Sequence, residues 1–265
     1  MTAAEPDILA KITGAVRERL AQHPPSADLE LRARETAAKR VGAGGRSLHA
    51  ALMQPGVRVI AECKRRSPSK GSLREPFEPV ELARAYQAGG AAAVSVVTEP
   101  EFFAGDAGWI PLLRREVSLP VMQKDFLLSP RQIFEAALLG ADAVLLIARI
   151  LPGSLLSEML ALAGELGLEA LIEVHDEDDL ERALVLPAPM VGINARDLCT
   201  FRVDLEAATE LAARVPQDRL AVLESGISGP ADVATLVKRG FRHFLVGEHL
   251  VRSGDPRATL AELLA

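Results

Sequence analysis

The chain has 265 residues, of which 49% are hydrophobic and 25% charged, and its formal net charge is −6. This composition is typical of a globular protein with a large buried core, and an acidic chain without a Lys- or Arg-rich stripe is not expected to bind nucleic acid. The N-terminus lacks the basic flank and apolar run of a secretory signal, and no stretch reaches the roughly 18 apolar residues of a membrane helix. We therefore expect a cytoplasmic protein with no membrane partner.

Residues 1–50 precede the repeating part of the sequence and predict two or three helices, at 8–22, 28–40 and 47–53. A segment of this length is too short to bury a hydrophobic core of its own. We therefore predict an N-terminal helical extension that packs on the rest of the chain, rather than a second domain.

After residue 55, short apolar runs alternate with amphipathic stretches that end in glycine, as in QAGG, LLG, ELG and KRG. Apolar strands separated by helices are typical of a parallel sheet covered by helices. Eight such units predict an α/β fold, a single (β/α)8 TIM barrel, so that residues 1–265 form one domain. An open Rossmann sheet is the minor alternative, because no GxGxxG follows the first strand. The expected strands are 57–63, 91–97, 119–124, 142–148, 168–174, 189–194, 219–225 and 242–247.

Polar side chains recur where these strands end, which in a barrel of this kind is the mouth that binds substrate. Glu62 and Lys64 share one face of the first strand by its two-residue period. Lysines and glutamates gathered at one mouth shift each other's proton affinities, and so provide acids and bases that work near neutral pH. Later strands end in Lys124, Glu173, Asn194, Glu224 and Ser225.

Two glycines, Gly226 and Gly247, follow the seventh and eighth strands, where barrel enzymes commonly bind phosphate through backbone N–H groups. A simple turn at each glycine remains the alternative. The HDEDD run at 175–179 is interpreted as the cap and first turn of a helix rather than a metal cluster. Cys63 and Cys199 have no zinc-binding spacing. These features predict a small phosphorylated substrate and no metal.

In order, and along nearly the whole chain, these motifs resemble the indole-3-glycerol phosphate synthase family of tryptophan biosynthesis. The segments that carry the resemblance are the N-terminal ILAKI helix, IAECKRRSPSKG, QKDF, LIEVH, GINARDL and ESGI. The resemblance implies conversion of 1-(2-carboxyphenylamino)-1-deoxyribulose 5-phosphate into indole-3-glycerol phosphate, with loss of carbon dioxide and water. It also implies that no metal or organic cofactor is needed.

The resemblance further assigns roles to individual residues. Lys124 is expected to be the general acid at the substrate carbonyl oxygen. Glu173 is expected to serve the later dehydration with Glu62 in support, while Lys64 holds the departing carboxylate and takes part in a later proton transfer. The other substrate-binding assignments are Ser67 of the SPS loop, Asn194 and Arg196 for orientation of the substrate, Phe126 and Leu146 for the aromatic ring, and Glu224, Ser225, Gly226 and Gly247 for the phosphate end.

At the phosphate end the chain departs from its relatives, which often carry a serine where this sequence has Glu248. We expect the Glu248 carboxylate to point away from the phosphate, because like charges repel.

Three alternatives stay open from the sequence. One is another phosphate-binding barrel enzyme, such as phosphoribosylanthranilate isomerase. Another is an aldolase that forms a Schiff base through Lys64 or Lys124, and the third is a ligand-binding barrel without catalysis. Association with other enzymes of the tryptophan pathway is not decided by the sequence.

Overall fold

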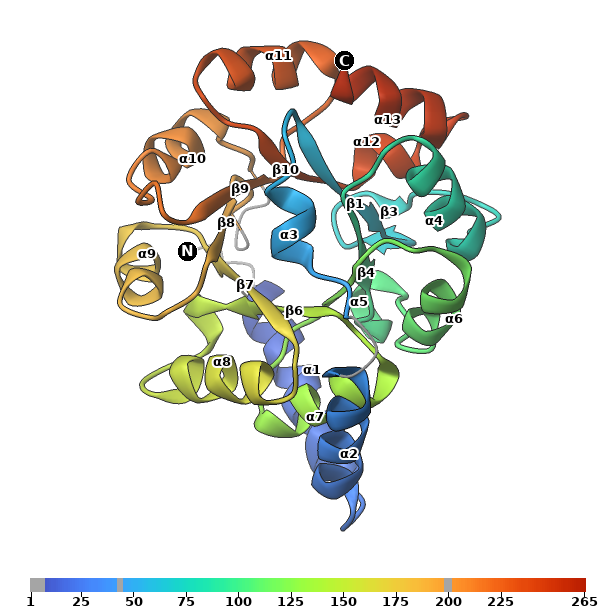
Figure 1. Ribbon diagram of the computed structural model, residues 1–265, viewed down its shortest axis with the longest axis vertical. Helices are drawn as coiled ribbons and strands as arrows, with labels where there is room; N and C mark the ends of the chain where they lie inside the picture. Colours follow the sequence, from blue (N-terminus) through green and yellow to red (C-terminus); the bar gives the residue numbers. More distant parts are fainter. Residues whose placement is uncertain (1–7, 42–44, 198–201) are drawn as a thin grey trace, which may run out of the picture.

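The computed structural model describes residues 8–41, 45–197 and 202–265, and it contains a closed barrel of eight parallel strands (Figure 1). The order around the ring is β1-β10-β9-β8-β7-β6-β5-β4. All eight predicted strands and the TIM-barrel fold are therefore confirmed. The strands are β1 (Arg58–Cys63), β4 (Ala93–Val97), β5 (Val121–Lys124), β6 (Ala143–Ile147), β7 (Glu169–Val174), β8 (Met190–Asn194), β9 (Leu220–Glu224) and β10 (His243–Val246).

Helices surround the ring of strands in Figure 1 and bury their apolar faces against it. Sequence signals set their ends: Ser129 and Asp176 accept hydrogen bonds from backbone N–H groups in the first turns of α7 and α9, so the HDEDD run is a helix cap as predicted. Among the described residues, no helix is both long and apolar enough to cross a bilayer. The helices are α4 (Pro79–Ala88), α5 (Pro100–Phe103), α6 (Trp109–Glu116), α7 (Pro130–Leu139), η1 (Ala148–Ile150), α8 (Leu155–Glu165), α9 (Glu177–Leu184), α10 (Leu205–Ala212), α11 (Pro230–Lys238), α12 (Glu248–Val251) and α13 (Pro256–Leu264).

The N-terminal extension forms α1 (Ile8–Gln22), α2 (Leu29–Val41) and α3 (Leu48–Leu52), close to the predicted ranges. Apolar residues of α1 and α2 belong to the same hydrophobic core as the barrel. In Figure 1, α3 lies over the centre of the ring. It is held there by the carboxylate of Glu169, at the start of β7, which accepts hydrogen bonds from Ser47 Oγ at 2.6 Å and from the His49 N–H at 2.9 Å. The end of the barrel opposite the mouth is thus closed.

A small hairpin stands in the loop after β1, where we expected no strands. It consists of β2 (Arg66–Ser67) and β3 (Gly71–Ser72), which pair antiparallel. Arg66 Nε donates a hydrogen bond of 3.0 Å to the carbonyl oxygen of Phe102, which ties the hairpin to α5. Strands of two residues give no alternating pattern, so periodicity could not reveal them.

Candidate active site

A cavity of about 650 Å³ opens at the C-terminal ends of the strands. Side chains that lie far apart in the sequence meet there because parallel strands bring all their carboxyl ends to the same rim. The structure gathers every predicted site residue except Leu146 around this cavity: Glu62, Lys64, Ser67, Lys124, Phe126, Glu173, Asn194, Arg196, Glu224, Ser225, Gly226, Gly247 and Glu248.

The expectation for Leu146 is corrected by the alternation of β6. Leu145 and Ile147 line the cavity, whereas Leu146 lies between them in the strand and is buried on its other face. Phe103 of α5 also lines the cavity and was missed by the sequence reasoning; its ring centroid lies 6.1 Å from that of Phe126. The only signal for Phe103 was an aromatic pair in the loop after the second predicted strand.

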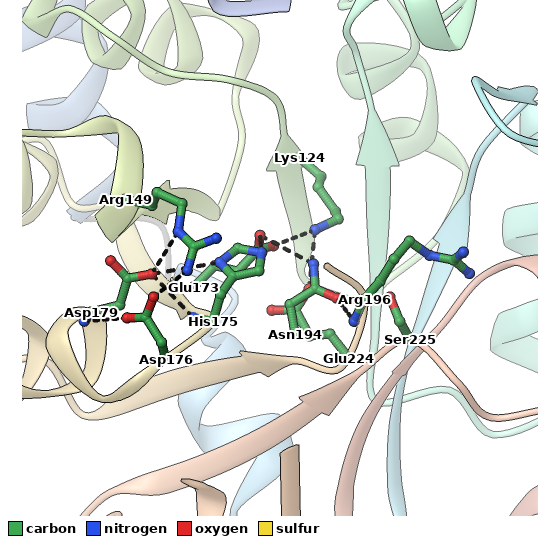
Figure 2. Close-up of polar contacts among 10 residues, drawn as sticks. All are labelled: Lys124, Arg149, Glu173, His175, Asp176, Asp179, Asn194, Arg196, Glu224 and Ser225. Atoms are coloured by element: carbon green, nitrogen blue, oxygen red, sulfur yellow. Dashed lines mark hydrogen bonds and ion pairs between the residues drawn. The ribbon is translucent and has the colours of Figure 1, made fainter. Parts of the chain in front are cut away.

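Lys124, at the end of β5, lies at the centre of the polar cluster (Figure 2). Its Nζ donates to Glu173 Oε2 at 2.9 Å and to Glu224 Oε2 at 3.1 Å. Burial alone would lower the pKa of Lys124, but the two carboxyl groups outweigh it and raise the pKa above its usual range. The side chain is therefore held as an ammonium ion.

The two glutamates beside Lys124 have opposite electrostatic behaviour. Burial would raise the pKa of Glu173, but the Lys124 ammonium outweighs it and lowers this pKa. For Glu224 burial prevails, and together with the charge on Glu173 it raises the pKa to about 8. Among the described residues, Glu224 Oε1 has no hydrogen-bond partner, and an unpaired carboxylate oxygen is costly to bury, in line with the raised pKa. The two carboxyl groups beside the ammonium group thus differ in their affinity for a proton.

A second pair, Glu62 and Lys64, comes from the end of β1. Their two-residue spacing puts both on the cavity side, and Lys64 Nζ lies 2.6 Å from Glu62 Oε1. The Glu62 side chain is almost fully buried, whereas Lys64 reaches toward the open space. The rim therefore offers one ammonium group between two carboxyl groups and a second one paired with a third carboxyl group.

Two glycines make room for these carboxyl groups. A Cβ atom on Gly192 of β8 would lie 2.1 Å from Glu224 Oε1, and one on Gly247 would lie 2.3 Å from Glu62 Oε1. Both distances are far below van der Waals contact, so neither position has space for a side chain. Gly247 was predicted only as a phosphate contact, and Gly192 was not predicted at all.

Asn194 and the loop after β9 form a connected set of hydrogen bonds. Asn194 Oδ1 accepts from Ser225 Oγ at 2.9 Å and from the Arg196 N–H at 3.0 Å. Its Nδ2 is therefore turned to Glu173 Oε1, at 3.2 Å. Ser225 and Gly226 have left-handed backbone conformations, with φ of 67° and 84°. Ser225 is a non-glycine residue in this region, which is an uncommon conformation of the kind that clusters at functional sites.

Glu248, the first residue of α12, lines the cavity together with Arg252. Its Oε1 lies 3.6 Å from Arg252 Nε, one helical turn further along the chain. A cation thus accompanies the carboxylate at this end of the cavity.

A family model, a sequence relative and solved structures are similar to this chain. The family model for indole-3-glycerol phosphate synthase matches residues 7–263. An indole-3-glycerol phosphate synthase from Aromatoleum aromaticum is 44% identical over 260 residues, which span 97% of this chain and 98% of that protein. Two solved structures share the fold. A 3-hexulose-6-phosphate synthase has a TM-score of 0.63 and 16% identity, over 78% of this chain and 97% of that one. A thiamine phosphate pyrophosphorylase from Pyrococcus furiosus has a TM-score of 0.58 and 20% identity, over 78% of this chain and 93% of that one.

Proposed function

The chain belongs to the indole-3-glycerol phosphate synthase family, and we propose that the cavity at the mouth of its barrel is where the indole ring is closed. Its substrate is 1-(2-carboxyphenylamino)-1-deoxyribulose 5-phosphate, and its products are indole-3-glycerol phosphate, carbon dioxide and water. The observation that carries the proposal is the partly buried Lys124 ammonium group, held between Glu173 and Glu224 at the cavity.

Lys124 acts in the ring-closing step. The ring carbon that bears the carboxylate forms a bond to the keto carbon, and the keto double bond opens toward its oxygen. Lys124 gives its proton to that oxygen as negative charge develops there. The carboxyl groups on either side support this role because they hold the ammonium ion in place before the substrate arrives.

Lys64 acts on the carboxylate that leaves. Its ammonium group pairs with the substrate carboxylate and fixes it beside Glu62. When the carbon–carbon bond to the carboxylate breaks, its electrons restore the aromatic ring and carbon dioxide departs.

Glu173 serves the final dehydration. The hydroxyl group made in the first step takes a proton from the Lys64 ammonium group and leaves as water, and the neighbouring carbon gives a proton to Glu173. Because the pKa of Glu173 is lowered, this residue starts as a carboxylate and can take up a proton as the base. Glu62 supports this step, and Lys64 takes part in the proton transfer.

The remaining residues bind and orient the substrate. Phe126, together with Phe103 and the side chains of Leu145 and Ile147, forms an apolar wall for the aromatic ring. Ser67, Asn194 and Arg196 orient the chain between ring and phosphate. Glu224, which the resemblance assigned to the phosphate end, contacts Lys124 and so acts beside the keto oxygen in this proposal. Backbone N–H groups of the loops after β9 and β10, at Ser225, Gly226, Gly247 and Glu248, meet the phosphate.

The test follows the fluorescence of the indole product after the substrate is added. We expect Lys124→Ala to lower turnover by roughly 10²-fold to 10⁴-fold, the usual contribution of a general acid, while circular dichroism shows a folded protein. Lys124→Arg keeps the charge but cannot release its proton, so it should also be nearly inactive. Lys238→Ala, at the exposed end of α11, is the matched control. Ordinary turnover in Lys124→Ala, or a borohydride-trapped adduct on a lysine, would contradict this mechanism.

A further inference from the structure

His175 is a buried histidine that follows β7 and has no part in the reaction described above. Its side chain is only 3% exposed, and it lies behind Glu173 rather than among the residues that line the cavity. Nε2 lies 3.3 Å from Glu173 Oε1, and Nδ1 lies 3.8 Å from Asp179 Oδ2 (Figure 2). The imidazole ring is thus placed between two carboxyl groups.

The outer carboxyl group, on Asp179, is itself held firmly. It sits in the first turn of α9 and accepts a 3.2 Å hydrogen bond from the His175 backbone N–H. Arg149 Nε, from η1, lies 3.3 Å from the same Oδ2 atom and also pairs with Asp176. Figure 2 therefore shows a row of groups in which Arg149, Asp179, His175 and Glu173 follow one another up to Lys124.

The ring packs against both carboxyl groups without a well-aligned hydrogen bond to either. Among the described residues, neither Nδ1 nor Nε2 of His175 has a hydrogen-bond partner. The ring nevertheless fills the space behind Glu173 Oε1, at 3.3 Å, and so limits where this buried carboxyl group can move.

We propose that His175 is a positioning residue for Glu173: its buried imidazole ring contacts Oε1 and fixes the orientation of the carboxyl group. The ring and the Asn194 amide both face Glu173 Oε1, which leaves Oε2 turned toward Lys124. The consequence for catalysis rests on the role proposed for Glu173, but the contact itself does not.

The electrostatics of the two carboxyl groups support this assignment. Burial would raise the pKa of Glu173, while Lys124 and then His175 lower it. Burial would likewise raise the pKa of Asp179, while His175 and Arg149 lower it. The charged groups around the ring are Glu173 of β7, Asp179 of α9 and Arg149 of η1, which pairs with Asp179. An opposite charge at such a distance typically changes a carboxyl pKa by about one to three units.

The first experiment compares pH profiles of kcat/KM for the wild type and His175→Gln, which keeps an N–H donor but has no charge. We expect the acid limb to move up by about one to three pH units, because Glu173 then becomes protonated at higher pH. The effect should fall on kcat more than on KM. His243→Gln, on β10 at the opposite end of the barrel, is the matched control and should leave the profile unchanged. An unmoved acid limb in His175→Gln, even with lower activity, would show a merely structural role and overturn the proposal.

The second experiment needs no turnover and so separates this inference from the proposed function. Carbon-13 NMR of the free protein follows the titration of the Glu173 carboxyl group, whose signal is identified by its loss in Glu173→Gln. We expect this titration to move to higher pH in His175→Gln and to stay in place in His243→Gln. An unmoved Glu173 titration in His175→Gln would overturn the proposal, whatever the enzyme assay gives.

Discussion

Gly192→Ala tests whether the empty space at β8 is what allows the Lys124 cluster to form. The new methyl group would lie 2.1 Å from Glu224 Oε1, 3.2 Å from its Cδ and 3.3 Å from Leu171 Cγ. Atoms of this kind normally approach to about 3.5 Å, so the carboxyl group must retreat by more than about 1 Å. This movement breaks the 3.1 Å hydrogen bond between Lys124 and Glu224.

The cost of this substitution has two parts. Overpacking a tight interior costs about 1–3 kcal/mol, and loss of a hydrogen bond to a charged group costs about 1.5–3 kcal/mol. We therefore expect the free energy of unfolding, measured in urea, to fall by about 2.5–6 kcal/mol. Turnover should fall by about 100-fold, because a misplacement of about 1 Å in a catalytic group has that effect.

Two companion variants make the result specific. Gly164→Ala, in α8, has nothing within 4 Å of the new methyl group, so it should be neutral or stabilise the helix by up to about 1 kcal/mol. Glu224→Ala removes the group that Gly192 accommodates. Adding Gly192→Ala to this variant should then cost little, a non-additive result for two residues in contact. Additive losses, or wild-type activity in Gly192→Ala alone, would refute the explanation.

Further predictions concern charge, the ring wall and a buried cap. In the folded protein the pKa of Glu224 is raised to about 8, whereas in the unfolded chain it has its ordinary value of 4.5, so the stability of the wild type should decline as the pH rises from 4.5 to 8. Glu224→Gln should remove this part of the pH dependence of the free energy of unfolding in urea. An unchanged pH dependence would contradict the raised pKa. Leu145→Ala should raise KM about tenfold, whereas Leu146→Ala should leave KM unchanged and cost about 2–5 kcal/mol in stability; the reverse pattern would restore the original expectation for Leu146. The Glu99 carboxylate accepts hydrogen bonds from three backbone N–H groups of α5 and pairs with Arg19. Glu99→Gln should loosen α5 and the Phe103 side chain that it carries, and so raise KM with little change in kcat. An unaltered KM would show that α5 has no part in substrate binding.

The architecture was predictable because its signals are local. Eight apolar runs with glycine punctuation identified eight strands, and the prediction for β7 at 168–174 differs from Glu169–Val174 by one residue. Polar residues at strand ends were predictable for the same reason, since the barrel itself brings those ends together. Lys124 and Glu173 therefore came from sequence alone as site candidates.

The features that sequence could not supply depend on neighbours in space. Which residues of β6 face the cavity depends on how the strand packs against its neighbours. Leu146 was therefore expected at the cavity, whereas Leu145 and Ile147 line it. The importance of Gly192 lies in a side chain of the adjacent strand, which nothing near position 192 reveals. The same holds for His175, whose meaning comes from the two carboxyl groups that its ring faces.

The two ends of the cavity deal with negative charge by different means. At the Lys124 end, the carboxyl groups hold the lysine as an ammonium ion, and burial raises the pKa of one of them, Glu224, to about 8. At the other end Glu248 is partly exposed, and Arg252 lies one helical turn away. The guanidinium group offsets the charge of the carboxylate in a pair that solvent weakens. A phosphate at the site proposed beside Gly247 would then meet backbone N–H groups and a balanced pair, so we expect the carboxylate in place of a serine to be compatible with an anionic ligand.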